Sequence, residues 1–129
     1  MKKGRSSKRS IPFSFVLEEL DSLQPIVKPM FGCFMVYLAE KAVLFLCNSD
    51  RAIFANQQGV WVATTPEHYR SLAREFSSTR SEKPGRIGKS PWLRLPACAP
   101  DFEEQVNRAC QLILDRDPRI GRITGRGKL

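Results

Sequence analysis

Two apolar segments joined by a very short link constrain the fold of this chain more than any other feature. Residues 33–38 and 42–47 are apolar almost throughout, and only residues 39–41 separate them. So short a link allows two strands to pair antiparallel, whereas parallel pairing needs a much longer crossover. The sequence therefore predicts a β-hairpin within an antiparallel sheet.

Further short strands are expected on both sides of this hairpin. Pro29 interrupts the strand before it, which is typical of an edge strand or a bulge. Gly59 follows two glutamines and is suited to the positive φ of a turn between two later strands. The additional strands are predicted at residues 26–31, 51–56, 60–63 and 92–96.

Three helices are predicted around these strands, near 15–23, over 66–76 and from about 101 to 114. Ser14 and Thr65 are typical N-cap residues for the first two. Asp101 caps the third, and Glu104 is placed for a reciprocal bond. The order of elements predicts an α+β two-layer sandwich, in which an antiparallel sheet of about five strands carries helices mainly on one face.

The net charge of +8 is concentrated at the two ends of the chain. Residues 1–13 carry five basic and no acidic side chains, and residues 116–129 carry five basic and one acidic. Residues 14–115 carry 11 basic and 12 acidic side chains. We therefore expect a disordered basic arm over 1–13, a single domain over 14–115 and a flexible basic tail over 116–129.

These basic ends, with the polar loop predicted over 77–91, make nucleic acid a candidate partner. Each Lys or Arg that contacts a phosphate releases counterions, which favours binding at low salt. The alternatives are solubilising arms and a solvated loop. The candidate phosphate contacts are Lys2, Lys3, Arg5, Lys8, Arg9, Arg80, Lys83, Arg86, Lys89, Arg122, Arg126 and Lys128.

The cysteines and the single histidine offer little chemistry. Cys33, Cys47, Cys98 and Cys110 are widely spaced and form no C-x-x-C pair, so we expect reduced, mostly buried thiols. Cys33 or Cys98 with His68 is the one arrangement that suggests a small thiol-dependent enzyme. We predict a protein that is not an enzyme and has neither a metal nor another cofactor.

No segment is predicted to enter a membrane. The longest apolar run, residues 42–47, is far shorter than the ~20 residues that a spanning helix needs. The apolar stretch near the N-terminus ends at two glutamates and is followed by no small-residue cleavage site. A cytoplasmic location is therefore expected.

A series of short motifs between residues 27 and 46 carries a family resemblance. VKPMFG at 27–32 is followed by VYL at 36–38 and VLFL at 43–46. This order resembles the TfoX N-terminal domain family, whose members typically carry a Met-Phe-Gly-Gly segment, a Tyr-Leu strand, a turn glycine and a second apolar strand. The resemblance covers about residues 14–76. Cys33 stands at the family's second glycine, and Glu40-Lys41 replaces the turn glycine.

The resemblance implies an α+β fold with an antiparallel sheet and a non-catalytic regulatory or adaptor role. The best-known relatives act in transcriptional control of competence and normally carry a second, C-terminal domain. We therefore expect a binding or regulatory module with a protein partner, and Met30, Phe31 and Gly32 are its candidate recognition surface. The alternative for these three residues is a core role for Met30 or Phe31 and a backbone requirement at Gly32. An exposed strand near Pro29 also suggests a homodimer formed by edge pairing.

Overall fold

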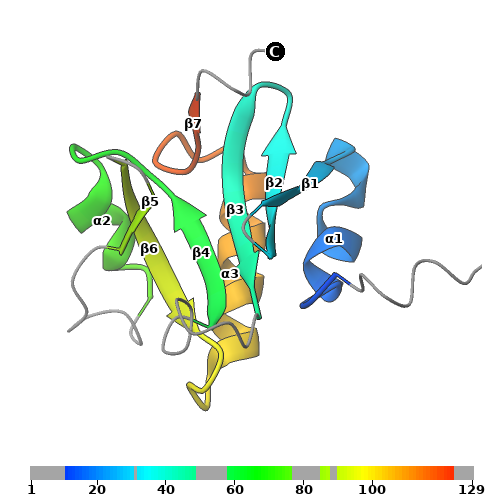
Figure 1. Cartoon of the computed structure of the whole chain (residues 1–129). Coiled ribbons are helices and arrows are strands. Elements are labelled where there is room, and N and C mark those ends of the chain that lie inside the picture. Colours follow the sequence, from blue (N-terminus) through cyan, green and yellow to red (C-terminus); the bar gives the residue numbers. More distant parts are fainter. Residues whose placement is uncertain (1–10, 31, 49–57, 77–84, 88–89, 124–129) are drawn as a thin grey trace, which may run out of the picture.

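A single antiparallel sheet organises the molecule, and helices pack on one of its faces (Figure 1). The computed structural model describes residues 11–30, 32–48, 58–76, 85–87 and 90–123. The strands are β1 (Ile26–Met30), β2 (Cys33–Leu38), β3 (Lys41–Cys47), β4 (Gly59–Ala63), β5 (Gly85–Ile87), β6 (Ser90–Pro96) and β7 (Arg122–Ile123). This architecture confirms the predicted α+β sandwich.

The strand order follows the chain closely, because most strands pair with a neighbour in sequence. The order is β1-β2-β3-β4-β6-β5, every adjacent pair is antiparallel, and β7 lies beside β3. Leu38 pairs with Lys41 at the end of the central hairpin. β1, which contains Pro29, lies at an edge of the sheet, as the proline predicts.

Two strands lie where the sequence predicted none. β5 pairs with β6 inside the region expected to be a loop, and β7 lies in the region expected to be a flexible tail. Each is short, so apolar alternation gives almost no signal for it. The strand predicted at 51–56 lies outside the described residues.

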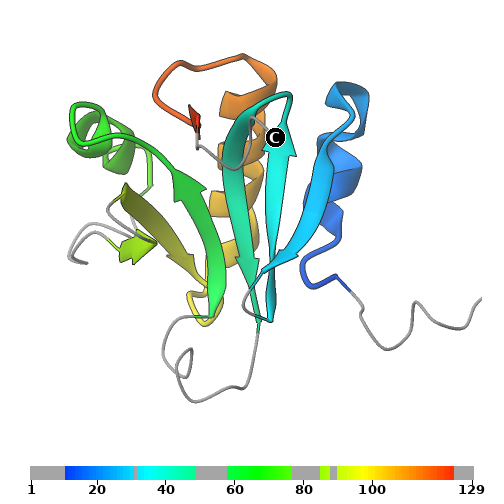
Figure 2. The same ribbon diagram turned by 45° about the horizontal axis from the view of Figure 1, so that its top comes forward.

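The helices are α1 (Phe15–Glu19), the 3-10 helix η2 (Asp21–Leu23), α2 (Tyr69–Ala73) and α3 (Phe102–Leu114). Figure 2 shows α1 and α3 behind the sheet. Neither Ser14 nor Asp101 forms the expected side-chain cap. The Asp101 carboxylate instead accepts a hydrogen bond from Gln105 Nε2 at 3.2 Å.

Both faces of the sheet are buried, which explains the nearly unbroken apolar runs of its central strands. Val36, Leu44 and Val62 face the helices and belong to the larger core. Met35 and Phe45 belong to a second buried cluster formed by the alternate positions on the opposite face. The buried residues of this second cluster are Cys33, Met35, Tyr37, Ala42, Phe45, Cys47, Trp61, Ala63 and Trp92.

The packed body extends beyond the predicted boundaries of 14 and 115. The Phe13 ring lies 5.1 Å from the Phe102 ring, so residues just before α1 pack against the start of α3. At the other end, Ile120 is buried in the larger core and β7 joins the sheet. Residues 11–13 and 116–123 are therefore part of the folded unit and not of basic arms.

Candidate ligand-binding pocket

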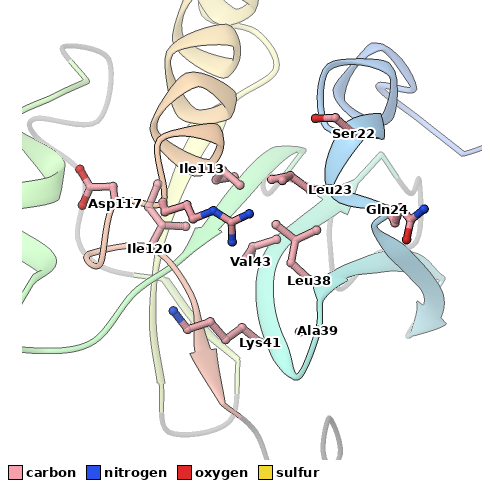
Figure 3. Close-up of a pocket in the computed structure, with 11 residues that line it drawn as sticks. Ser22, Leu23, Gln24, Leu38, Ala39, Lys41, Val43, Ile113, Asp117 and Ile120 are labelled. Carbon is pink, nitrogen blue, oxygen red and sulfur yellow. The ribbon is translucent and has the colours of Figure 1, made fainter.

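A cavity of about 410 Å³ opens on the helix-covered side of the sheet (Figure 3). Three separate segments enclose it: residues 22–24 at the end of η2, residues 38–43 around the β2–β3 turn, and residues 113–120 at and after the end of α3. Its volume falls within the range of roughly 300–1,000 Å³ that is typical of small-molecule sites. The pocket is therefore large enough for a small organic ligand.

The walls of the pocket are largely aliphatic, and each segment contributes to them. Leu23 comes from η2, Leu38 and Val43 flank the hairpin turn, and Ile113 and Ile120 come from the third segment. Figure 3 shows Leu23, Leu38 and Ile113 pointing toward one another across the cavity. These side chains also pack on the larger core, so the apolar wall is continuous with the interior.

Two cations, Lys41 and Arg116, also line the pocket. None of the ion pairs formed among the described residues includes either of them. Asp117, the one carboxylate among the described residues of the lining, is ion-paired with Arg119 at 2.7 Å, and in Figure 3 it points away from the cavity. The pocket therefore combines an apolar interior with an excess of positive charge.

Unusual backbone conformations gather around this pocket. Of the four non-glycine residues with positive φ in the described part of the chain, Gln24, Ala39 and Arg116 line it, with φ of 54°, 55° and 61°. A left-handed conformation costs an L-residue roughly 1–2 kcal/mol, and such conformations cluster at functional sites. The pocket shape thus depends on backbone turns that most side chains disfavour.

Arg116 stands at the position after α3 where many helices have glycine. Its N–H donates to the Ile113 carbonyl at 2.9 Å, and the Asp117 N–H donates to the Leu112 carbonyl at 3.0 Å. Together these two bonds form a Schellman motif, which turns the chain sharply out of the helix. The turn keeps Arg116 at the pocket and sends Asp117 toward Arg119.

Arg119 fixes the segment that follows α3. Its guanidinium donates to the Asp117 carboxylate at 2.7 and 2.9 Å and to Glu75 at 2.9 Å. It also donates to the hydroxyl and carbonyl oxygens of Ser71, which lies in α2. Arg108 donates to the other oxygen of Glu75 at 2.7 Å, so one carboxylate just after α2 contacts both α3 and the segment that follows α3.

These ion pairs shift the pKa values of the groups that form them. Hydrogen bonds from Arg119 lower the pKa of Asp117 to about 2, although partial burial opposes the shift. Hydrogen bonds from Arg108 and then from Arg119 lower the pKa of Glu75. The same two carboxylates raise the pKa of Arg119. All three groups are therefore charged at neutral pH and act as a structural network.

Hydrogen bonds to main-chain carbonyl groups anchor the same segment to the end of β4. The buried Thr64 hydroxyl donates to the Arg119 carbonyl at 2.8 Å, and the Gly121 N–H donates to the Ala63 carbonyl at 2.8 Å. Arg122, predicted to contact phosphates from a flexible tail, instead donates to the Thr64 carbonyl at 3.3 Å. Gly121 has φ of 106°, and a Cβ there would meet the stem of Lys41 at 3.3 Å. Glycine thus lets this segment lie against the pocket lysine.

The predicted recognition surface is divided between two environments. Met30 is half-buried against the second cluster, and Gly32 is exposed with φ of 83°. The pocket lies elsewhere, and neither residue lines it. Phe31 lies outside the described residues, as do Lys2, Lys3, Arg5, Lys8, Arg9, Arg80, Lys83, Lys89, Arg126 and Lys128. Arg86 lies in β5, and its side chain is also outside the description.

The structure does not bring the candidate thiols to His68. Cys33 is buried beside Cys47, which pairs with Gly59 at the first residue of β4. Cys98 is exposed and follows Pro96, which pairs with the same glycine. His68 instead follows the far end of β4, and a five-residue strand separates its ends by roughly 13 Å. This geometry gives no support to a cysteine–histidine catalytic pair.

Within the described ranges there is no group of three or more His, Cys, Asp or Glu side chains able to hold a metal ion. The helices of the same ranges include none that is both long and apolar enough to cross a membrane.

Sequence reasoning did not identify this pocket. Lys41 belongs to the predicted hairpin link, whereas Arg116 falls in the predicted flexible tail. No sequence pattern therefore predicted that the two cations lie at one pocket. The only available signal was an arginine where a helix would ordinarily be followed by glycine.

Comparison of the chain with protein-family models, with curated proteins and with solved structures finds no match. The resemblance to the TfoX N-terminal domain therefore rests on the motifs between residues 27 and 46 alone.

Proposed function

We propose that this protein is a non-catalytic binding module whose pocket takes a ligand with an apolar body and an anionic group, such as a medium-chain carboxylate. The observation that carries the proposal is the presence of two cations, Lys41 and Arg116, at an aliphatic cavity where the one carboxylate among the described lining residues is already ion-paired. A ligand-dependent binding module agrees with the regulatory role that the TfoX resemblance implies.

The two parts of the pocket have distinct energetic roles. Burying the ligand's apolar body contributes about 25 cal/mol for each Å² removed from water. The anionic group gains charge-assisted hydrogen bonds, and a guanidinium can hold a carboxylate through two parallel bonds. A neutral ligand of the same length would offer neither cation an anionic partner, so it should bind more weakly.

The test is a titration of the ¹⁵N- and methyl-labelled chain with octanoate, followed by NMR. Octanoate should shift the methyl signals of Leu23, Leu38 and Ile113, and octanol should bind more weakly at the same site. Lys41→Ala should weaken octanoate binding by roughly fivefold, which corresponds to about 1 kcal/mol for one partly screened charge pair.

Arg74→Ala is the matched control, because Arg74 is an exposed arginine outside the pocket lining. This variant removes the same net charge and should leave the affinity unchanged. Equal affinity for octanol and octanoate, or equal weakening by the two variants, would show that the pocket cations do not recognise the anion.

Nucleic-acid association is the second candidate function, and the uneven distribution of charge along the sequence supports it. Residues 11–13 and 116–123 pack on the folded body, so a truncation that tests the arms should remove only residues 1–10 and 124–129. If the arms bind the phosphates of duplex DNA, a plot of the logarithm of the association constant against the logarithm of the salt concentration should have a slope of about −0.9 for each phosphate contact. Truncation should make that slope shallower. Equal salt dependence in the full and truncated chains would exclude the arms as the site.

A further inference from the structure

Two buried thiols face each other across neighbouring strands. Cys33 begins β2 and Cys47 ends β3, next to the paired residues Phe34 and Leu46. Their sulfur atoms lie 3.1 Å apart, and the Cys33 thiol donates toward Cys47 Sγ. Both side chains belong to the second cluster, with relative exposures of 1% and 0%. The adjacent positions in the sheet thus place a dithiol at one end of the hairpin.

Little movement separates this pair from a covalent bond. A disulfide has sulfur atoms about 2.05 Å apart, so the two must approach by roughly 1 Å. Residues opposite each other in an antiparallel pair have Cβ atoms about 4.5–5.5 Å apart, close to the 3.5–4.5 Å of disulfides. A small change at the strand ends is therefore enough.

The two sides of the pair differ in their freedom to move. Cys47 pairs with Gly59, where an added Cβ would lie 2.2 Å from the Leu95 carbonyl oxygen, so that side of the sheet is tightly packed. Cys33 follows the exposed Gly32, whose φ is 83°. Both cysteines are terminal strand residues, and strand ends open locally at lower cost than the whole fold. Such opening gives a small oxidant access to them.

The other two cysteines differ from this pair. Burial, and secondarily the charge of Glu19, raises the pKa of Cys110 to about 12, which keeps that thiol protonated. Cys98 is exposed. Among the described residues, only Cys33 and Cys47 form a cysteine–cysteine contact.

We propose that Cys33 and Cys47 form a reversible redox site that a hydroperoxide converts to a cross-strand disulfide. One sulfur, as thiolate, attacks the peroxide O–O bond, becomes a sulfenic acid, and releases water or the corresponding alcohol. The second sulfur then attacks the sulfenic sulfur; its proton leaves with the hydroxyl group as water, and the S–S bond forms. The two thiols together lose two electrons, which reduce the peroxide. A dithiol reductant reverses the reaction by exchange.

Trypsin separates the four cysteines, so the wild-type chain can test this proposal directly. Cleavage at Lys and Arg, except before proline, places Cys33 in residues 10–41, Cys47 in 42–51, Cys98 in 95–108 and Cys110 in 109–116. The folded chain is treated with hydrogen peroxide, alkylated under denaturing conditions and digested without reduction. We expect peptide 10–41 linked to 42–51, with a loss of two hydrogen atoms and of both alkylation sites, and full recovery of both thiols after dithiothreitol treatment.

Two variants provide the controls. Cys98→Ser should leave the linked peptide unchanged, whereas Cys33→Ser should abolish it, with circular dichroism used to confirm that each variant folds. The proposal would be overturned if Cys33 and Cys47 stay fully alkylated at peroxide levels that oxidise Cys98. It would equally be overturned if the main disulfide contains Cys98 or Cys110. Neither result bears on octanoate binding, so this site and the pocket are tested separately.

Discussion

Arg116 is an arginine in a left-handed backbone conformation, and two substitutions separate its backbone cost from its side-chain role. Arg116→Ala and Arg116→Gly both remove the guanidinium that lines the pocket. Only glycine also removes the Cβ that disfavours the observed φ of 61°. The difference between the two variants therefore measures the backbone cost, and their common change measures the loss of the cation.

The magnitudes follow from the geometry. The left-handed Cβ costs roughly 1–2 kcal/mol, and the extra freedom of unfolded glycine offsets about 0.5–1 kcal/mol of that gain. The glycine variant should thus be more stable than the alanine variant by about 1 kcal/mol, or roughly 0.5 M in urea midpoint. Both variants should bind octanoate about fivefold more weakly than the wild type.

Urea denaturation followed by tryptophan fluorescence measures the stabilities, and calorimetric titration measures the affinities. Gln24→Gly is the matched control, because Gln24 has φ of 54° at the same pocket but carries no charge. It should gain stability and keep its affinity. Equal stability of the alanine and glycine variants would show that residue 116 does not adopt the left-handed conformation. Unchanged octanoate affinity in both variants would show that the Arg116 guanidinium does not contact the ligand.

Three further predictions concern the stability of the fold. Gly59→Ala should lower the free energy of unfolding by more than about 2 kcal/mol in thermal denaturation, because its φ is 142° and the new Cβ would lie 2.2 Å from the Leu95 carbonyl oxygen. Thr64→Val should cost about 1–2 kcal/mol in urea denaturation, since it leaves the Arg119 carbonyl without its hydroxyl donor; a loss below 0.5 kcal/mol would contradict this role. The pKa of Asp117 in the folded protein, about 2, is below its ordinary value of 3.8. The ionised carboxylate therefore stabilises the fold by roughly 1–2 kcal/mol above pH 4, and this stabilisation is lost as the pH falls toward 2. Asp117→Asn should therefore make the fall in stability between pH 4 and pH 2 shallower, whereas an unchanged acid profile would show that the ion pair with Arg119 contributes little.

The sequence predicted the central hairpin well because local and tertiary preferences agree there. Residues 33–38 form β2 as predicted, and β3 is one residue longer than expected because Lys41 joins it. The apolar segments are long enough to need burial, and the link is too short for any other connection.

The segment after α3 was mispredicted because distant contacts decide its structure. Its arginines and glycine read as a flexible basic tail, which is a sound local interpretation. In the structure, Ser71 and Glu75 of the α2 region hold Arg119, and Thr64 holds both Arg119 and Arg122. Partners more than forty residues away convert the expected tail into a wall of the pocket. No local pattern contains that information.

The most direct test of the binding proposal is to locate octanoate on the protein by intermolecular nuclear Overhauser effects. We expect effects between the ligand's methylene protons and the methyl groups of Leu23, Leu38 and Ile113, and their loss at the same ligand concentration in the Lys41→Ala, Arg116→Ala double variant. Effects confined to other methyl groups, or a pattern that the double variant leaves intact, would contradict it.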